Sequence, residues 1–298
     1  MQTDACKLTT LSLSDNHIGD QGLRSLARAL ASPRSRIANL TLAHNEIGLR
    51  GTRYLAQSIS HEAHASVIAK LNISGNSISD GGIEVLAQSL RAASCRVTSL
   101  NVARIRMGIR GARALHDLLI HADNRLTELQ MQQNHVRGHG STYIASALTH
   151  AHCNLATLNI SDNRIGKTGV RAFGDAISHA DCTLTSLTMA RNYASSEIGG
   201  YIHDALARST GPLRLTMLDV SHNPLSDEAV AAIKASVEAH PCIRLLIEPC
   251  GFWVSIAQGV DHVMVECDAS GRPLDPKYKD EGQLCKDTGR VKHNGETW

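Results

Sequence analysis

The chain repeats itself with a period of 29 to 31 residues, and this period constrains its fold more than any other feature. The segment Leu8–Asn16 returns seven times, at starts 37, 68, 97, 126, 155, 184 and 215. A fixed period of this length is typical of repeat architectures, in which each copy is one supersecondary unit stacked on its neighbours. The 298 residues, enough for two compact domains, are therefore expected to form one stack instead.

Within each copy, the spacing of the apolar residues changes from that of a strand to that of a helix. Leu11 and Leu13 alternate with polar residues, as in a short strand. Leu26 and Leu30 are four residues apart, so they fall on one helical face, and every copy is apolar at both positions. Each repeat is thus predicted to be a strand, a turn and a helix. Its core is expected to be aliphatic, because only nine of the 298 residues are aromatic.

The repeat resembles the leucine-rich repeat family, in its ribonuclease-inhibitor-like subclass. The first copy carries the pattern in full at Leu8, Leu11, Leu13, Asn16, Ile18, Gly19, Gly22, Leu26, Ala27 and Leu30. The resemblance implies an α/β fold: a right-handed curved solenoid, or horseshoe, with a parallel inner sheet and outer helices. Eight repeats of 29–31 residues then fill residues 1–248. Residues 249–298 are expected to form a separate C-terminal cap and extended tail.

The pattern is broken at one rung and left open at one end. Ile105 stands where the other copies have Asn, a residue whose amide satisfies backbone groups of neighbouring turns, so this rung is expected to differ. The first repeat begins seven residues from Met1, with no room for a capping unit. We interpret this edge either as a shortened chain or as a surface covered by another subunit.

The tail holds four of the nine aromatic residues. Phe252 and Trp253 lie in a predicted strand pair that bends near Gln258–Gly259. They are expected either to plug the open end of the solenoid or, together with Tyr278 and Trp298, to anchor a partner.

Composition argues against several partners. The formal net charge of +2 gives no global reason to bind nucleic acid or an anionic membrane. No run of eighteen apolar residues and no N-terminal signal are present, which favours a cytoplasmic location with reduced thiols.

The predicted concave face is small and neutral. Among its twenty-four alternate strand positions only Lys70, Glu128 and Asp219 are charged, and no two carboxylates lie on neighbouring rungs. Paired acid/base catalysis has no candidate there, so we expect no enzyme and no cofactor.

In most repeats the last residue of the repeated segment is an asparagine, such as Asn16, and we call these positions the Asn column. The residues just before the Asn column vary more between repeats, and they include the strongest local charge signal. Arg104 begins a run that continues with Arg106, Arg110 and Arg113 and includes no acid. This run is interpreted either as a solvated rim or as a docking patch for an acidic partner. The partner-binding candidates are Arg104, Arg106, Arg110, Arg113, Arg191, His222, Trp253, Tyr278 and Trp298.

Cysteines and histidines recur in phase near the helix-to-strand turns. Cys6, Cys95, Cys153 and Cys182 share a phase typical of a packed position. A zinc site is disfavoured because these cysteines and the histidines near them include no C-x-x-C or H-x-x-x-H pair. His121, His150 and His179 also share a phase, and they are expected to interact with the last carbonyl groups and the dipole of the helix before them.

Two classes of function remain open. The resemblance favours a non-enzymatic protein-interaction scaffold, part of a larger intracellular assembly in the cytoplasm, cytoskeleton or cilium. The alternatives are a GTPase regulator similar to Ran GTPase-activating proteins, and the ligand-recognition part of a sensor or effector.

Overall fold

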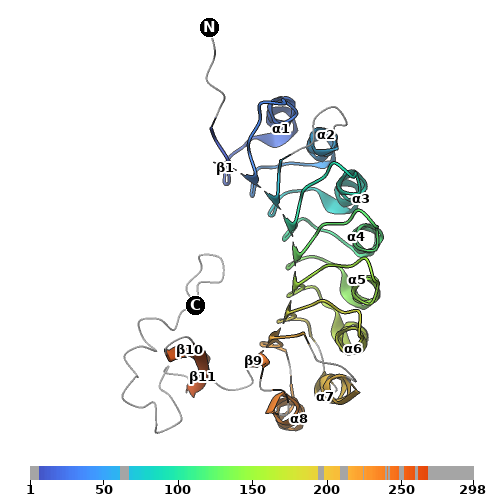
Figure 1. The fold of residues 1–298 in the computed structure, drawn as a ribbon, viewed down its shortest axis with the longest axis vertical. Coiled ribbons are helices and arrows are strands. Elements are labelled where there is room, and N and C mark those ends of the chain that lie inside the picture. Colours follow the sequence, from blue (N-terminus) through green and yellow to red (C-terminus); the bar gives the residue numbers. More distant parts are fainter. Residues whose placement is uncertain are drawn as a thin grey trace.

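In a computed structural model of the protein, strand–helix units follow one another in a curved stack (Figure 1). The structure describes residues 7–60, 67–193, 198–208, 214–223, 225–238, 240, 242–247, 252–258 and 261–267. Residues 252–258 and 261–267 are described as backbone only. The predicted α/β solenoid is confirmed, including its parallel inner sheet and outer helices.

The inner layer is a parallel sheet in which the order of the strands follows the order of the chain. Its members are three residues long: β1 Thr10–Ser12, β2 Asn39–Thr41, β3 Lys70–Asn72, β4 Ser99–Asn101, β5 Glu128–Gln130, β6 Thr157–Asn159, β7 Ser186–Thr188, β8 Met217–Asp219 and β9 Arg244–Leu246. Equivalent residues of successive repeats are paired, for example Leu11 with Leu40, so the sequence period and the sheet register coincide.

The outer layer consists of one helix per repeat, each packed against the next. The helices are α1 Gly19–Leu30, α2 Leu49–Ile59, α3 Ser79–Leu90, α4 Ile109–Leu119, α5 Arg137–Leu148, α6 Gly166–Ile177, α7 Ile198–Arg208 and α8 Asp227–Glu238. None of the described helices is long and apolar enough to span a bilayer.

The core between the two layers is aliphatic, as the composition predicts. The strand position of Leu40 and the helix position of Leu55 are buried in the interior repeats. Phe173, in α6, is an aromatic ring among the fully buried side chains. Burial of each such side chain contributes about 1.5–3 kcal/mol, and a repeat obtains it only by contact with its neighbours.

Glycine at the first helical turn permits close contact with the residue four positions earlier. A Cβ on Gly82 would lie 2.2 Å from Ile78 Cγ2, and one on Gly111 would lie 2.4 Å from Met107 Cγ. This close approach accounts for glycine at these positions.

The two ends of the chain differ. At the N-terminal end, β1 pairs with β2 alone among the described strands. Beyond the repeats, β10 Phe252–Gln258 and β11 Asp261–Cys267 form the expected antiparallel pair. The division of the chain at residue 248 stays a prediction.

Candidate binding surface

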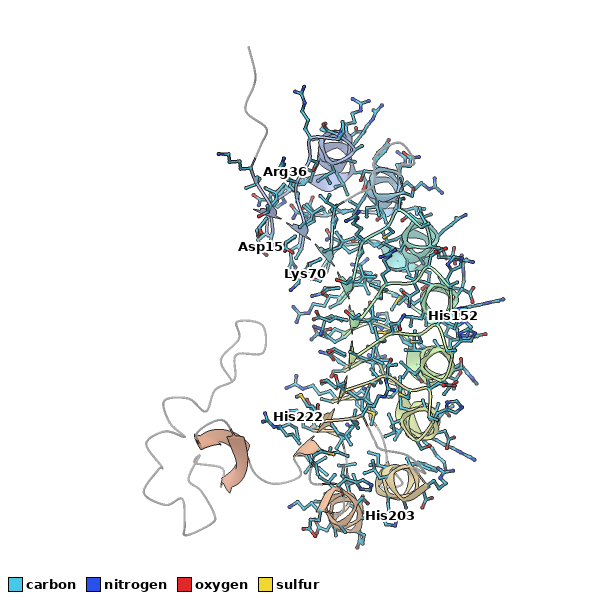
Figure 2. All side chains as sticks on the ribbon, viewed as in Figure 1. Asp15, Arg36, Lys70, His152, His203 and His222 are labelled. Carbon is cyan, nitrogen blue, oxygen red and sulfur yellow. The ribbon has the colours of Figure 1, made fainter. Side chains whose placement is uncertain are left out.

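The concave face is formed by strand side chains, and its acidic groups are already hydrogen-bonded within the face. Glu128 accepts a hydrogen bond of 2.9 Å from Ser99 Oγ. Asp219 is only 5% exposed and accepts hydrogen bonds from the backbone N–H and the hydroxyl of Ser221, at 3.0 and 2.7 Å. Lys70 is an exposed charge on this inner side of the arc (Figure 2). The ninth strand adds exposed Arg244, which the sequence-based count of eight rungs missed.

A second surface is the edge formed by the strand-to-helix loops, which we call the loop edge. Its first row is the residue before the Asn column: Asp15, His44, Gly75, Arg104, Gln133, Asp162, Arg191 and His222. All eight residues have left-handed backbone conformation, with φ between +52° and +67°. Figure 2 places Asp15 and His222 at opposite ends of the inner row of strands.

Backbone hydrogen bonds hold this row in register beyond the ends of the strands. The N–H of Arg104 donates to Gln132 O at 3.1 Å, and the N–H of Gln133 donates to Ser161 O at 2.9 Å. The same bond links the row in the other repeats, up to Arg191. Neighbouring members of the row are therefore separated by one strand spacing, about 4.8 Å.

The conformation of the strand-to-helix loop differs between repeats, because a further left-handed residue occurs at one of two positions, or at both in repeat six. It lies one residue after the Asn column at Glu46, Arg106, Arg164 and Tyr193, and three residues after it at Gly19, Ser79, Arg137 and Gly166. Before α2 and α4 the course is fixed by the preceding repeat. There Asp20 Oδ1 accepts the N–H groups of Gly48 and Gly51, and Asp80 Oδ1 accepts the equivalent groups before α4.

From repeat four to repeat seven, the loop edge is rich in arginine. The left-handed positions there include Arg104, Arg106, Arg164 and Arg191 in the loops and Arg137 at the first residue of α5, where the loop ends. All five are exposed, and Asp162 is the acid among them. Arg104 Nε donates to Gln133 Oε1. Tyr193, 69% exposed, stands in the same row of loops.

The structure divides the predicted arginine run between two surfaces. Arg104 and Arg106 lie in the loop edge, whereas Arg110 and Arg113 lie in α4. Arg110 is paired with Glu84 of α3 through its Nε and Nη2, at 3.0 and 2.8 Å from Glu84 Oε1.

The other predicted binding residues are distributed as follows. Arg191 and His222 belong to the loop edge. Trp253 lies in β10, described as backbone only, and Tyr278 and Trp298 lie outside the described residues. The sequence reasoning missed Arg137, Arg164 and Tyr193. Their signal was present as basic and aromatic residues recurring one or three positions after the Asn column.

A ladder of buried asparagines runs beneath the loop edge. Asn134 Oδ1 accepts the N–H groups of Ile105 and Met107, at 3.1 and 3.0 Å. Its Nδ2 donates to the carbonyl oxygens of Val102 and Met131, at 2.9 and 3.0 Å. Each such side chain joins the loop of one repeat to the loop before it, as its amide chemistry predicts.

Ile105 interrupts this ladder, as expected from the sequence. Asn76 accepts the N–H groups of Asn45 and Ile47, at 2.9 and 3.0 Å. One repeat later, Ile105 offers no side-chain acceptor, and the N–H groups of Asn76 and Ile78 have no hydrogen-bond partner in the described part of the chain. The asparagine link is therefore missing between repeats three and four, which remain joined by Asp80 and Glu84 on the helix side.

The buried cysteines are packed thiols, as their phase predicts. Cys95, Cys153 and Cys182 are free and buried. Burial raises the pKa of all three thiols, and backbone hydrogen bonds only partly oppose this shift. These thiols are consequently poor nucleophiles at neutral pH.

The aligned histidines make a different contact from the one expected. His121 Nδ1 and His179 Nδ1 accept the backbone N–H two residues on, at 3.3 and 3.2 Å, instead of bonding to helix carbonyl groups. The reason is that backbone N–H groups already satisfy those carbonyls, as the N–H of His121 does for Leu118 O at 3.1 Å. Within the described residues, no group of three His, Cys, Asp or Glu is placed to bind a metal.

Comparison with known proteins agrees with this geometry. A family model described as Leucine Rich repeat matches residues 4–27, 67–87, 151–174 and 215–234. A 93-residue segment is 30% identical to the mouse (Mus musculus) protein "NACHT, LRR and PYD domains-containing protein 12". That segment is 31% of this chain and 8% of the mouse protein, so the chain matches under a tenth of that relative.

Solved structures support the fold alone. The chain resembles an internalin from Listeria monocytogenes with a TM-score of 0.51 and 17% identity, over 82% of this chain and 54% of the other. A structure of a TLR13–ssRNA13 complex matches at a TM-score of 0.34 and 15% identity, over 80% and 39%, which is too low to carry an argument. The chain therefore carries leucine-rich repeats in the segments that the family model matches. Its pattern is compatible with the ribonuclease-inhibitor-like subclass.

Proposed function

We propose that the protein is a non-enzymatic protein-interaction scaffold that works as a subunit of a larger intracellular assembly. Leucine-rich repeat folds generally serve protein recognition, which supports the first part of the proposal. The open N-terminal edge of the sheet carries the second part.

This edge exposes residues that the other repeats bury. Leu40 and Leu42 of β2 and its loop are 1% and 0% exposed, whereas the equivalent Leu11 and Leu13 are only half-buried. Leu8, beside β1, is 46% exposed. Among the described strands, none pairs with the free side of β1. An apolar edge of this kind favours a further polypeptide on that side. Another subunit that caps this edge would bury the exposed leucines and could pair with the backbone groups of β1.

Gel filtration of the tagged full chain from cell extracts, with identification of co-eluting proteins, tests the proposal. We expect elution well above the size of one chain. Leu8→Glu should dissociate the assembly because it places a charge on the open edge, whereas Val67→Glu, at an apolar position of repeat three that is 37% exposed, should not. Elution of the wild type as a single chain would contradict the proposal, as would equal effects of the two variants.

A second candidate is the ligand-recognition part of a multidomain sensor. The segment similar to the mouse NACHT, LRR and PYD protein favours it, because the repeats there form one part of a longer chain. Regulation of a GTPase, the other alternative, has no comparable observation in its favour.

The proposed setting is the cytoplasm, with protein partners rather than nucleic acid or membrane. The free thiols of Cys95, Cys153, Cys182 and exposed Cys242 support a reducing compartment. Cell fractionation tests this location, including the cytoskeletal and ciliary fractions.

A further inference from the structure

The arginine-rich part of the loop edge has a form that suits one kind of partner. We propose that the loop edge of repeats four to seven binds an acidic, extended polypeptide segment that lies across the rungs. This inference rests on the proposed function and names the chemical class of its partner.

The spacing of the edge fits such a segment. The rungs of Arg104 and Arg191 are separated by three strand spacings, about 14 Å in all. An extended chain advances about 3.3 Å per residue, so four or five residues cover this distance. Alternate side chains of the segment then point to the edge at about 6.6 Å intervals, within reach of the long guanidinium groups.

Several of these arginine side chains have N–H donors that are not used in hydrogen bonds within the solenoid. The side chains of Arg106, Arg137 and Arg164 make no hydrogen bond or ion pair within the described residues. Arg110 on the outer helices, in contrast, is neutralised by Glu84. These three arginines therefore carry positive charge that no described acidic group neutralises, and guanidinium groups bind carboxylates in bidentate fashion.

Backbone strain at these positions points in the same direction. A left-handed conformation costs a side-chain-bearing residue about 1–2 kcal/mol, whereas glycine adopts it freely. Gly19 and Gly166 occupy the position of Arg137 in their repeats, with φ of +56°, +54° and +57° respectively. An arginine at this position thus destabilises the fold relative to glycine, and its exposed side chain offers no packing in return. Because this conformation recurs in other repeats, it belongs to the fold, and it leaves the side chain of Arg137 exposed and available for binding.

The pattern favours an acidic polypeptide over a nucleic acid. Asp162 interrupts the row and would repel an unbroken line of phosphates, whereas a polypeptide can place a neutral side chain opposite it. Tyr193 is the one aromatic residue among the left-handed loop positions described, too few for a series of stacked bases. Its ring instead suits contact with an apolar residue of the bound segment.

Fluorescence anisotropy with the full chain tests the proposal. The probe is a labelled twelve-residue peptide of alternating glutamate and serine, and the reference peptide has glutamine in place of glutamate. We expect saturable binding of the acidic peptide only, weakened several-fold when the salt concentration rises from 50 to 300 mM.

Two double variants with the same change in net charge locate the site. Arg106→Glu with Arg164→Glu should weaken binding at least tenfold, because both residues lie on the loop edge. Arg110→Glu with Arg113→Glu, in α4, should change it less than twofold. The milder pair Arg106→Gln with Arg164→Gln should give an intermediate loss, and circular dichroism melts show that each variant is folded.

Three results would overturn the inference: no saturable binding of the acidic peptide, equal losses in the two charge-reversed variants, or tighter binding of a twelve-nucleotide single-stranded RNA that depends on the same arginines. If the acidic peptide fails to bind while the wild type still elutes as a large assembly, only this inference falls. Elution of the wild type as a single chain would remove the proposed function itself.

Discussion

The loop edges of repeats one to three and of repeats four to seven follow similar backbone courses but differ in charge. In the first region the left-handed positions hold Asp15 and Glu46 together with glycine and serine, and Glu46 is paired with His17 at 2.7 Å. In the second region they hold five arginines. The register of the sheet dictates the backbone course, so the side chains at these positions are free to differ. Ile105 lies where the two regions meet.

The largest expected effect concerns the asparagine ladder. Asn134→Ala should lower the free energy of unfolding by about 3–5 kcal/mol, because it leaves two buried N–H groups and the carbonyl group of Val102 without partners. The carbonyl group of Met131 keeps its hydrogen bond from Asn163. Asn16→Ala is the matched control in repeat one. The Asn16 side chain is exposed and bonds only to carbonyl groups of its own loop, so we expect a loss below about 1 kcal/mol. Urea titration followed by circular dichroism measures both, and equal losses would show that the ladder does not join repeats.

Thiol labelling compares the buried interior with the C-terminal end of the solenoid. Cys153 and Cys182 should react with iodoacetamide at pH 8 at least about 100-fold more slowly than exposed Cys242. Burial raises the pKa of both buried thiols, so the thiolate form is scarce at this pH and their reaction should still accelerate above pH 9. Mass spectrometry of quenched samples gives each rate. Similar rates at all three sites would contradict the packed position.

Ile105→Asn restores the missing rung between the two regions. The new amide should accept the N–H groups of Asn76 and Ile78, so their hydrogen exchange should slow about tenfold or more. The change in stability should stay within about 1–2 kcal/mol, because the new hydrogen bonds offset the lost burial of isoleucine. The amides of Asn45 and Ile47, already bonded to Asn76, provide the internal reference. Unchanged exchange at Asn76 would show that these groups are satisfied by other means.

The smallest expected effect comes from substitutions that exchange arginine and glycine between equivalent positions of the two regions. Arg137→Gly should stabilise the protein by up to about 1 kcal/mol, and Gly19→Arg should destabilise it by a similar amount. No atom lies within 4 Å of a Cβ on Gly19, so conformation rather than steric contact determines the result. Thermal melts of both variants test this, and a loss of stability in Arg137→Gly would indicate that the arginine packs on the fold.

The fold was predictable because each repeat expresses the same two spacings. The aliphatic columns of Leu26 and Leu30 were assigned to a helical face, and their interior counterparts Leu55 and Ile59 are fully buried. The sequence also predicted the interruption of the asparagine ladder at Ile105, because a hydrophobic side chain has no hydrogen-bond acceptor.

The candidate surface was predicted only in part, because proximity in sequence was taken for proximity in space. Helix α4 begins at Ile109, so Arg110 and Arg113 lie on the helix, whereas Arg106 remains in the loop. Arg137 begins α5 and Arg164 lies in a loop, so they occupy different phases of the repeat, yet both are exposed and have left-handed backbone conformation. The choice between loop courses depends on contacts between repeats, such as the one from Asp80 to Gly108, which no single repeat reveals.

The two unpartnered N–H groups beside Ile105 also bear on how the molecule comes apart. In a linear array, stability is the sum of each repeat's own contribution and its coupling to adjacent repeats. Between repeats three and four this coupling is divided unevenly: the loop side lacks its asparagine, whereas Asp80 and Glu84 join the helix side. Local opening at this junction is therefore expected to begin in the loops, before α3 and α4 separate.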